Sequence, residues 1–203
     1  MAAALGIRPG MTVAEIGAGT GAMAVEMARI VGRDGQVIAT ELGPGKLAAI
    51  RETARRAGVS NLSVLAAAEH ATNLPLACCE AIYMQRVYHH LTDPAGVIES
   101  ARQALKPGGR LAVIDFEPGG IKNLSTPRGV PDRGGHGVPK DALVREMRSF
   151  GLMLRGGLVD WPDGEYLGVF VATSSGSRTK PRTTREIPAL AAAFVEPDRR
   201  LLR

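Results

Sequence analysis

The chain has 203 residues with 45% hydrophobic and 22% charged side chains, which fits one globular domain with some chain left over and excludes wholesale disorder. Residues 174–203 carry seven basic and three acidic side chains and so supply +4 of the net charge of +5. Aromatic residues, which could stack on bases, make up only 4% of the chain. Nucleic acid is therefore not the expected partner. The two cysteines are adjacent, so they cannot form the spaced disulfide framework of a small secreted domain. No apolar run reaches the ~20 residues of a membrane span, and the first residues lack the features of a signal peptide. We therefore expect a cytoplasmic protein without a membrane partner.

Short apolar runs alternate with amphipathic segments along the first 115 residues. The expected strands are residues 11–16, 36–40, 62–66, 80–84 and 110–115. Apolar side chains recur at helical spacing over residues 22–31, 44–57 and 93–105. Strands that alternate with helices in this way predict a parallel sheet covered on both faces.

An irregular segment, residues 117–138, then breaks this rhythm with six glycines and three prolines. A connection of that length is typical of a functional loop, and we interpret it as a mobile lid over a substrate, with a plain connector as the alternative. A helix is expected over residues 139–150. Two final apolar runs, residues 152–161 and 165–173, are separated by Pro-Asp-Gly and predict an antiparallel hairpin that closes the sheet.

The sequence thus predicts one domain over residues 1–173 and a basic, disordered tail over residues 174–203. Within that tail, residues 187–195 can form at most an isolated turn or two of helix. The sequence does not determine the oligomeric state.

A glycine-rich segment, Glu15-Ile-Gly-Ala-Gly-Thr-Gly21, lies between the first expected strand and the first helix. Glycines there let the backbone approach a ligand, and the helix N-terminus presents free N–H groups, which predicts a nucleotide-type site. The glycines together with Ala22 also satisfy a dinucleotide pattern, and Glu41 ends the second strand, where a ribose-binding acid belongs. Glu15 favours a ligand with an ammonium group, because a carboxylate is an odd neighbour for a pyrophosphate.

Five motifs occur in order along the chain: Gly6-Ile-Arg-Pro-Gly10, Val13-Ala-Glu-Ile-Gly-Ala-Gly-Thr-Gly21, Ala39-Thr-Glu41, Ala81-Ile-Tyr-Met84 and Ala104-Leu-Lys-Pro-Gly-Gly-Arg-Leu111. With these motifs, roughly residues 5–173 resemble a class I S-adenosylmethionine-dependent methyltransferase. Three further segments, Val87-Tyr-His-His90, Leu91-Thr-Asp-Pro94 and Ile114-Asp-Phe116, are similar to a bacterial small-molecule subgroup known as type 11. The resemblance implies an α/β, Rossmann-like, doubly wound sheet of seven strands, mostly parallel with an antiparallel last strand, and helices on both faces.

The resemblance also implies where S-adenosyl-L-methionine binds. Gly17, Gly19 and Gly21 would pass under its methionyl part, with Glu15 near the ammonium group. Glu41 would accept both ribose hydroxyls, a bidentate role that needs a carboxylate.

The remaining cofactor residues follow from the same resemblance. Leu42 would form part of the adenine wall, and Gln85 would face the methyl-transfer centre. The side chain that holds the adenine amine is either Glu69 or His70, and the sequence does not choose between them.

Methyl transfer asks little of the protein chemically, because the sulfonium already carries an activated methyl group. A general base is needed only if the acceptor must lose a proton, and the candidates are His136, His89 and Tyr88. We expect no metal, because neighbours such as His89 and His90 rarely face one site and no third ligand is suitably spaced.

Two features depart from the family pattern. Only about ten residues precede the first strand, so the helices that cover cofactor and acceptor are expected to be short or missing. Met84-Gln-Arg86 stands where amino-methylating relatives have Asp/Asn-Pro-Pro-Tyr/Phe, which argues against methylation of adenine or glutamine amines.

The leading hypothesis is a cytoplasmic S-adenosylmethionine-dependent methyltransferase acting on a small-molecule acceptor. One alternative is a nicotinamide-dependent oxidoreductase that uses the same glycine loop, although no Tyr-x-x-x-Lys pair is present around Tyr83 or Tyr88. A second alternative is a methyltransferase-like module that keeps the cofactor pocket without catalysing a reaction.

Overall fold

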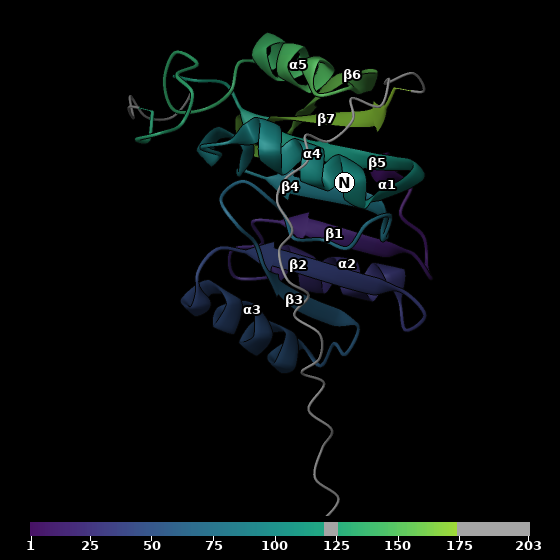
Figure 1. The fold of residues 1–203 in the computed structure, drawn as a ribbon. Helices are drawn as coiled ribbons and strands as arrows, with labels where there is room; N and C mark the ends of the chain where they lie inside the picture. The colour runs from purple at the N-terminus through teal and green to yellow at the C-terminus, as the bar shows by residue number, and fades with distance from the viewer. Residues whose placement is uncertain (120–125, 174–203) are drawn as a thin grey trace, which may run out of the picture.

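The computed structural model describes residues 1–119 and 126–173, which form a seven-stranded sheet flanked by helices (Figure 1). The tail at residues 174–203, with the turn of helix expected at 187–195, lies outside the described residues. So do residues 120–125 of the expected lid. Among the described residues, no helix combines the length and the apolar character that crossing a membrane requires.

The sheet has the strand order β3-β2-β1-β4-β5-β7-β6. Strands β1 to β5 pair in parallel, and β7 runs antiparallel to both of its neighbours. This confirms the predicted mostly parallel sheet with an antiparallel last strand. The strands are β1 (Thr12–Ile16), β2 (Gln36–Glu41), β3 (Leu62–Ala66), β4 (Cys79–Gln85), β5 (Leu105–Phe116), β6 (Leu152–Trp161) and β7 (Glu165–Ala172).

The four expected helices are present within one or two residues of their predicted ends, and a short N-terminal helix that was not predicted joins them. The helices are α1 (Ala2–Leu5), α2 (Ala22–Val31), α3 (Pro44–Ala57), α4 (Pro94–Ala104) and α5 (Lys140–Ser149), with single 3-10 turns η1 (Tyr88–His90) and η2 (Pro162–Gly164). Strand β5 begins five residues earlier than expected, because Leu105 already pairs with Cys79 across a register shift.

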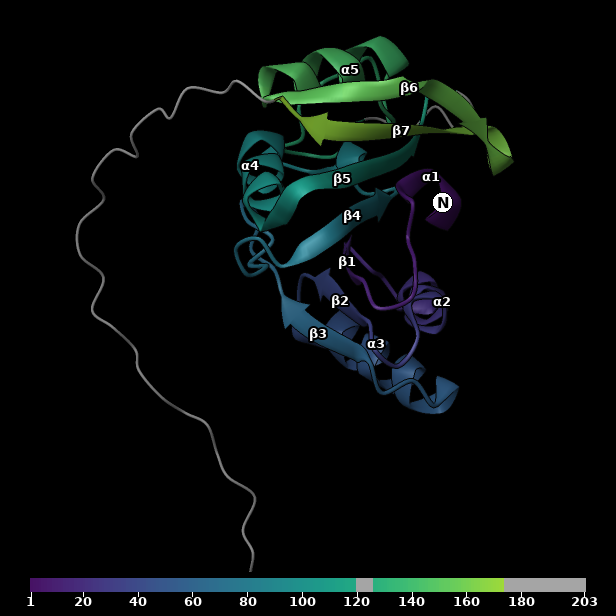
Figure 2. The same ribbon diagram turned by 90° about the vertical axis from the view of Figure 1, so that its right-hand side faces the viewer.

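Two hydrophobic layers hold the helices to opposite faces of the sheet. In β1, Ala14 and Ile16 pack into the layer that contains α4 and α5. Val13, the residue before Ala14, faces the layer that contains α1, α2 and Ile50 of α3. This alternation follows from the two-residue period of a strand, and Figure 2 shows α4 and α2 on opposite sides of the sheet.

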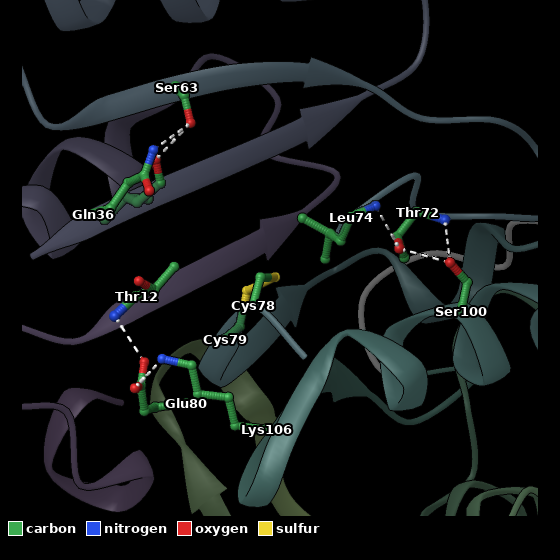
Figure 3. The surroundings of a disulfide bond; sticks show 11 residues. Thr12, Gln36, Ser63, Thr72, Leu74, Cys78, Cys79, Glu80, Ser100 and Lys106 are labelled. Atoms are coloured by element: carbon green, nitrogen blue, oxygen red, sulfur yellow. Dashed lines mark hydrogen bonds and ion pairs between the residues drawn. A yellow bond between two sulfur atoms is a disulfide. The ribbon is translucent and has the colours of Figure 1, made fainter. Parts of the chain in front are cut away.

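The N-terminal end of β4 carries the adjacent cysteines, joined by a disulfide (Figure 3). Cys79 is fully buried, which suits a small apolar side chain at the start of a strand, and the sequence analysis did not predict its bond to Cys78. Beside it, Glu80 accepts the backbone N–H of Thr12 at 2.9 Å and pairs with Lys106. These contacts fix this end of the central strands, and the opposite, carboxyl ends are left to form the site.

Candidate functional site

A cavity of about 540 Å³ lies at the carboxyl ends of β1, β2 and β4, which is where an open doubly wound sheet binds ligands. Six of the residues predicted to bind the cofactor line it: Gly17, Gly19, Glu41, Leu42, Glu69 and Gln85. The other three, Glu15, Gly21 and His70, lie outside its wall. The cavity therefore brings together most of the predicted cofactor residues from four separate loops.

The three glycines of the loop after β1 are needed for different structural reasons. A Cβ on Gly17 would lie 2.6 Å from Cγ2 of Val87, and a Cβ on Gly21 would lie 2.9 Å from Cγ2 of Ile50. Gly19 lines the cavity, has a φ of +57°, and a Cβ there would meet nothing within 4 Å. Gly17 and Gly21 are thus required by packing, while Gly19 keeps open a space that a bound ligand can fill.

The carboxylate of Glu41 closes the end of β2 and is only 6% exposed. Its Oε2 accepts the N–H of Gly19 at 2.9 Å, and its Oε1 accepts the N–H of Leu42 at 2.8 Å. Lys46 of α3 lies 3.4 Å from Oε1. The carboxylate is therefore held in one orientation at the cavity wall and also ties the glycine loop to β2.

Glu15 lies behind the glycine loop, with 5% of its surface exposed. Its Oε2 accepts the hydroxyl of Tyr83 at 3.0 Å. Burial raises the pKa of Glu15 to about 8, although the hydrogen bonds from Tyr83 and from the backbone of Ala24 oppose that rise. The structure thus places this carboxyl group in the layer beneath the loop, beside Tyr83.

A turn closed by the pairing of Ala68 with Ala71 presents the two candidates for the adenine amine. Both side chains are exposed, but Glu69 lines the cavity and His70 does not. The geometry therefore favours Glu69, an alternative that the sequence left open.

The segment after β4 is anchored by a carboxylate that the sequence did not single out. Buried Glu165, at the start of β7, accepts Nε2 of Gln85 at 3.1 Å and pairs with the guanidinium of Arg86. Arg86 has a φ of 55°, which is uncommon for a residue other than glycine, and its N–H donates to the carbonyl of Ile114. These bonds hold the turn so that Gln85, Arg86 and Val87 all line the cavity.

Tyr88, a predicted catalytic candidate, is fully buried and does not line the cavity. Its hydroxyl donates to Oε2 of Glu146 at 2.6 Å, and Arg133 lies over its ring. Burial raises the pKa of Tyr88 far above its ordinary value, and the charge of Glu146 adds to that effect. These contacts give Tyr88 a packing role between η1 and α5.

Three histidines cluster at the edge of the cavity. The ring centroid of His89 lies 4.0 Å from that of His90 and 4.6 Å from that of His136. His90 lines the cavity, and His89 and His136 lie behind it. One ligand atom from each of the three rings lies within 4.8 Å of the other two. The expectation of no metal assumed that neighbouring histidines diverge and that no third ligand is near. Both assumptions are wrong.

Comparison with known proteins agrees with this geometry. A family model described as a methyltransferase domain matches residues 14–113, which span the glycine loop, Glu41 and the turn after β4. The chain belongs to the class I S-adenosylmethionine-dependent methyltransferases. S-adenosylmethionine is the cofactor of this family, so the cofactor prediction is confirmed and the nicotinamide alternative is set aside.

The curated relatives include the ubiquinone/menaquinone biosynthesis C-methyltransferase UbiE of Pectobacterium carotovorum, 33% identical over 122 residues, which are 60% of this chain and 49% of the relative. The UbiE of Escherichia coli is 32% identical over 121 residues, with 59% and 48% covered. The chain thus spans about half the length of these curated relatives.

Solved structures share the fold at lower identity. A methyltransferase from Aquifex aeolicus superposes with a TM-score of 0.73 at 22% identity, covering 84% of this chain and 87% of that one. The trans-methyltransferase CalH, solved in complex with SAH, gives 0.63 at 16% identity, with 82% and 52% covered. These likenesses show the fold.

Proposed function

We propose that this protein transfers a methyl group from S-adenosylmethionine to a small-molecule acceptor in the cavity at the carboxyl ends of β1, β2 and β4. The observation that carries the proposal is the opening above Gly19, which is bordered by the fixed carboxylate of Glu41. A volume of about 540 Å³ lies within the range of ordinary small-molecule sites.

The residues on the cavity wall fit the cofactor. Glu41 presents its carboxylate to the ribose hydroxyls, and Leu42 offers an apolar surface beside it. Glu69 supplies an acceptor for the adenine amine from the opposite turn. Glu15 lies beneath the loop; burial keeps it protonated at neutral pH in the cofactor-free protein, and the positive charge of the methionyl ammonium group would favour its ionised form.

When bound, S-adenosylmethionine supplies an activated methyl group, so the chain has only to align the acceptor and, where necessary, remove its proton. The histidine cluster lies at the same cavity, with His90 on its wall. Partial desolvation and the neighbouring His89 lower the pKa of both His90 and His136, which favours the unprotonated form that can accept a proton. His89 is oriented by its 2.8 Å bond to Asp115.

A hydroxylated aromatic ring is the first acceptor class to test, because the curated relatives carry the names of quinone-biosynthesis C-methyltransferases. Removing a proton from a ring hydroxyl increases the electron density on the neighbouring carbon, which then attacks the methyl group. The cytoplasmic location stays a prediction, and so does the lid over residues 117–138.

Calorimetric titration tests the cofactor part of the proposal. S-adenosylmethionine and S-adenosylhomocysteine should bind with one site per chain, and NADH should not bind. Transfer of a labelled methyl group to a dihydroxynaphthalene then separates an enzyme from a non-catalytic module. Binding of NADH in place of S-adenosylmethionine would overturn the proposal.

Replacement of His136 tests the acceptor side. The His136→Ala variant should transfer methyl groups about 10²-fold more slowly, the usual contribution of a positioned acid or base. Its affinity for S-adenosylmethionine should stay unchanged, since His136 does not line the cavity. Equal turnover by variant and wild type would remove His136 from the mechanism.

A further inference from the structure

The histidine cluster has the composition and geometry of a metal site. His89 and His90 come from η1, and His136 comes from the loop that precedes α5. The centroids of His90 and His136 lie 5.3 Å apart, and the three rings meet at interplanar angles of 46°, 56° and 86°. The rings are therefore tilted around a common region and are not stacked as a parallel aromatic pair.

One member of the cluster is already oriented as a ligand. His89 and Asp115 are 3% and 0% exposed at their side chains, and Nδ1 of His89 lies 2.8 Å from Oδ1 of Asp115. Asp115 is itself fixed, because its two oxygens accept the backbone N–H groups of Phe116 and His89. A carboxylate that accepts Nδ1–H leaves the lone pair of Nε2 free, which is the outer-sphere arrangement found behind metal-bound histidines.

We propose that His89, His90 and His136 bind one divalent transition-metal ion. Neutral imidazole is a ligand for zinc and its neighbours in the periodic table, whereas magnesium and calcium prefer oxygen. Three protein ligands with one position left open are typical of catalytic zinc. Zinc is therefore the ion we expect to bind.

The cluster needs only a small contraction to close around the ion. Metal–nitrogen bonds of 2.0–2.1 Å place tetrahedral ligand atoms about 3.3 Å apart, and the three ligand atoms here lie within 4.8 Å of one another. His89 is held by Asp115, but His90 is exposed and His136 is only half-buried between Gly135 and Gly137. Side-chain rotation of these two histidines can supply the missing movement.

The open coordination position gives the site a role that rests on the proposed function. Because His90 lines the cavity, an ion held by the cluster lies at the cavity edge and can take an oxygen atom of the acceptor as its fourth ligand. With the ion bound, the nitrogen lone pairs of the cluster are used by the metal, so the ion takes over the task that the free rings would have as bases. Coordination favours the deprotonated form of the acceptor hydroxyl: its O–H bond breaks, the proton passes to solvent and the oxygen stays on the metal. The acceptor class is therefore an oxygen-bearing ring or enol.

Metal binding can be measured without cofactor or acceptor. The full chain, freed of metal by a chelator, is titrated with Zn²⁺ by calorimetry and with Co²⁺ by visible absorption, with Mg²⁺ as a hard cation for comparison. We expect one Zn²⁺ or Co²⁺ per chain, the visible bands of tetrahedral cobalt, and no detectable binding of Mg²⁺.

Single variants then locate the site. The His90→Ala and His136→Ala variants should each weaken Zn²⁺ binding by more than about 100-fold, since even loss of an outer partner typically costs 10–100-fold. Both positions lie away from the fully buried core, so these variants avoid the folding risk of replacing buried His89. His70→Ala is the matched control, because His70 is exposed and is the chain's only histidine outside the cluster.

The outcomes separate the metal site from the proposed function. Stoichiometric Zn²⁺ binding that is lost in both cluster variants and kept in His70→Ala supports the site, even if S-adenosylmethionine does not bind. Absence of one-to-one binding, or an unchanged affinity in a folded His136→Ala variant, overturns it. Equal weakening by His70→Ala also overturns it, because Zn²⁺ would then bind histidines without preference.

Discussion

Glu15 makes the stability of this protein depend on pH in a way that one substitution should remove. The pKa of its buried carboxyl is about 8, against an ordinary value near 4.5. Between those two pH values the native state therefore holds a proton that the unfolded chain has released. Folding stability must fall as the pH rises through this window and level off above it.

The magnitude follows from the size of the shift. Each pH unit inside the window costs about 1.4 kcal/mol, so the wild-type protein should lose about 3 kcal/mol between pH 5 and pH 7.5 through this group alone. The Glu15→Gln variant keeps an oxygen that can accept the hydroxyl of Tyr83 but has no proton to lose. It should match the wild type near pH 5 and be about 3 kcal/mol more stable at pH 7.5.

Thermal unfolding of the cofactor-free proteins measures the difference. For a domain of this size, about 3 kcal/mol corresponds to roughly 6–12 °C in melting temperature at pH 7.5. Glu26→Gln, which removes an exposed carboxylate from α2, is the matched control and should show no such trend. A Glu15→Gln advantage that stays constant from pH 5 to pH 8 would refute the reasoning, because it would show that Glu15 does not titrate in that window.

Three further predictions concern the cofactor cavity and the chain boundary. Glu41→Ala should weaken S-adenosylmethionine binding by about 10- to 150-fold, the equivalent of about 1.5–3 kcal/mol for a charge-assisted bidentate bond, and an unchanged dissociation constant in calorimetry contradicts the ribose assignment. Gly19→Val should abolish cofactor binding. Gly32 also has a positive φ, +68° against +57°, and open surroundings away from the cavity, so Gly32→Val should affect only the melting temperature. Removal of residues 176–203 should leave a folded domain that melts within a few degrees of the full chain, because β7 ends at Ala172, and an insoluble product shows that this boundary is wrong.

The fold could be predicted from the sequence because each of its elements is marked by residues that are close together in the chain. Apolar runs, helical spacing and the Pro-Asp-Gly turn each predict an element from neighbouring residues, and a parallel sheet follows from their alternation. The proposed cofactor residues could be predicted for a similar reason, since Gly19 lies in the turn after the first strand and Glu41 ends the second. Helix α1 was missed because four residues give no periodicity.

The acceptor side of the cavity was harder to predict from the sequence, because its contacts join segments that are far apart in the chain. His136 meets His89 and His90 through an irregular loop that has no period from which its path could be derived. Glu165 reaches Gln85 only because β7 inserts between β5 and β6. The one signal for Glu165 was an acid at the first residue of the last strand. The burial of Tyr88 could not be predicted, because a single 3-10 turn does not reveal which way its side chain points.

The contact between Gly17 and Val87 links the two halves of the cavity. Gly17 belongs to the loop that we propose to lie under the cofactor, while Val87 lies between the turn at Arg86 and the histidines of η1. With only 2.6 Å between a Cβ at Gly17 and the nearest methyl group of Val87, neither residue can grow without displacing the other. Attempts to redesign acceptor specificity should therefore leave Val87 in place and vary Leu91, which also lines the cavity, since a larger side chain at Val87 changes donor affinity together with acceptor choice.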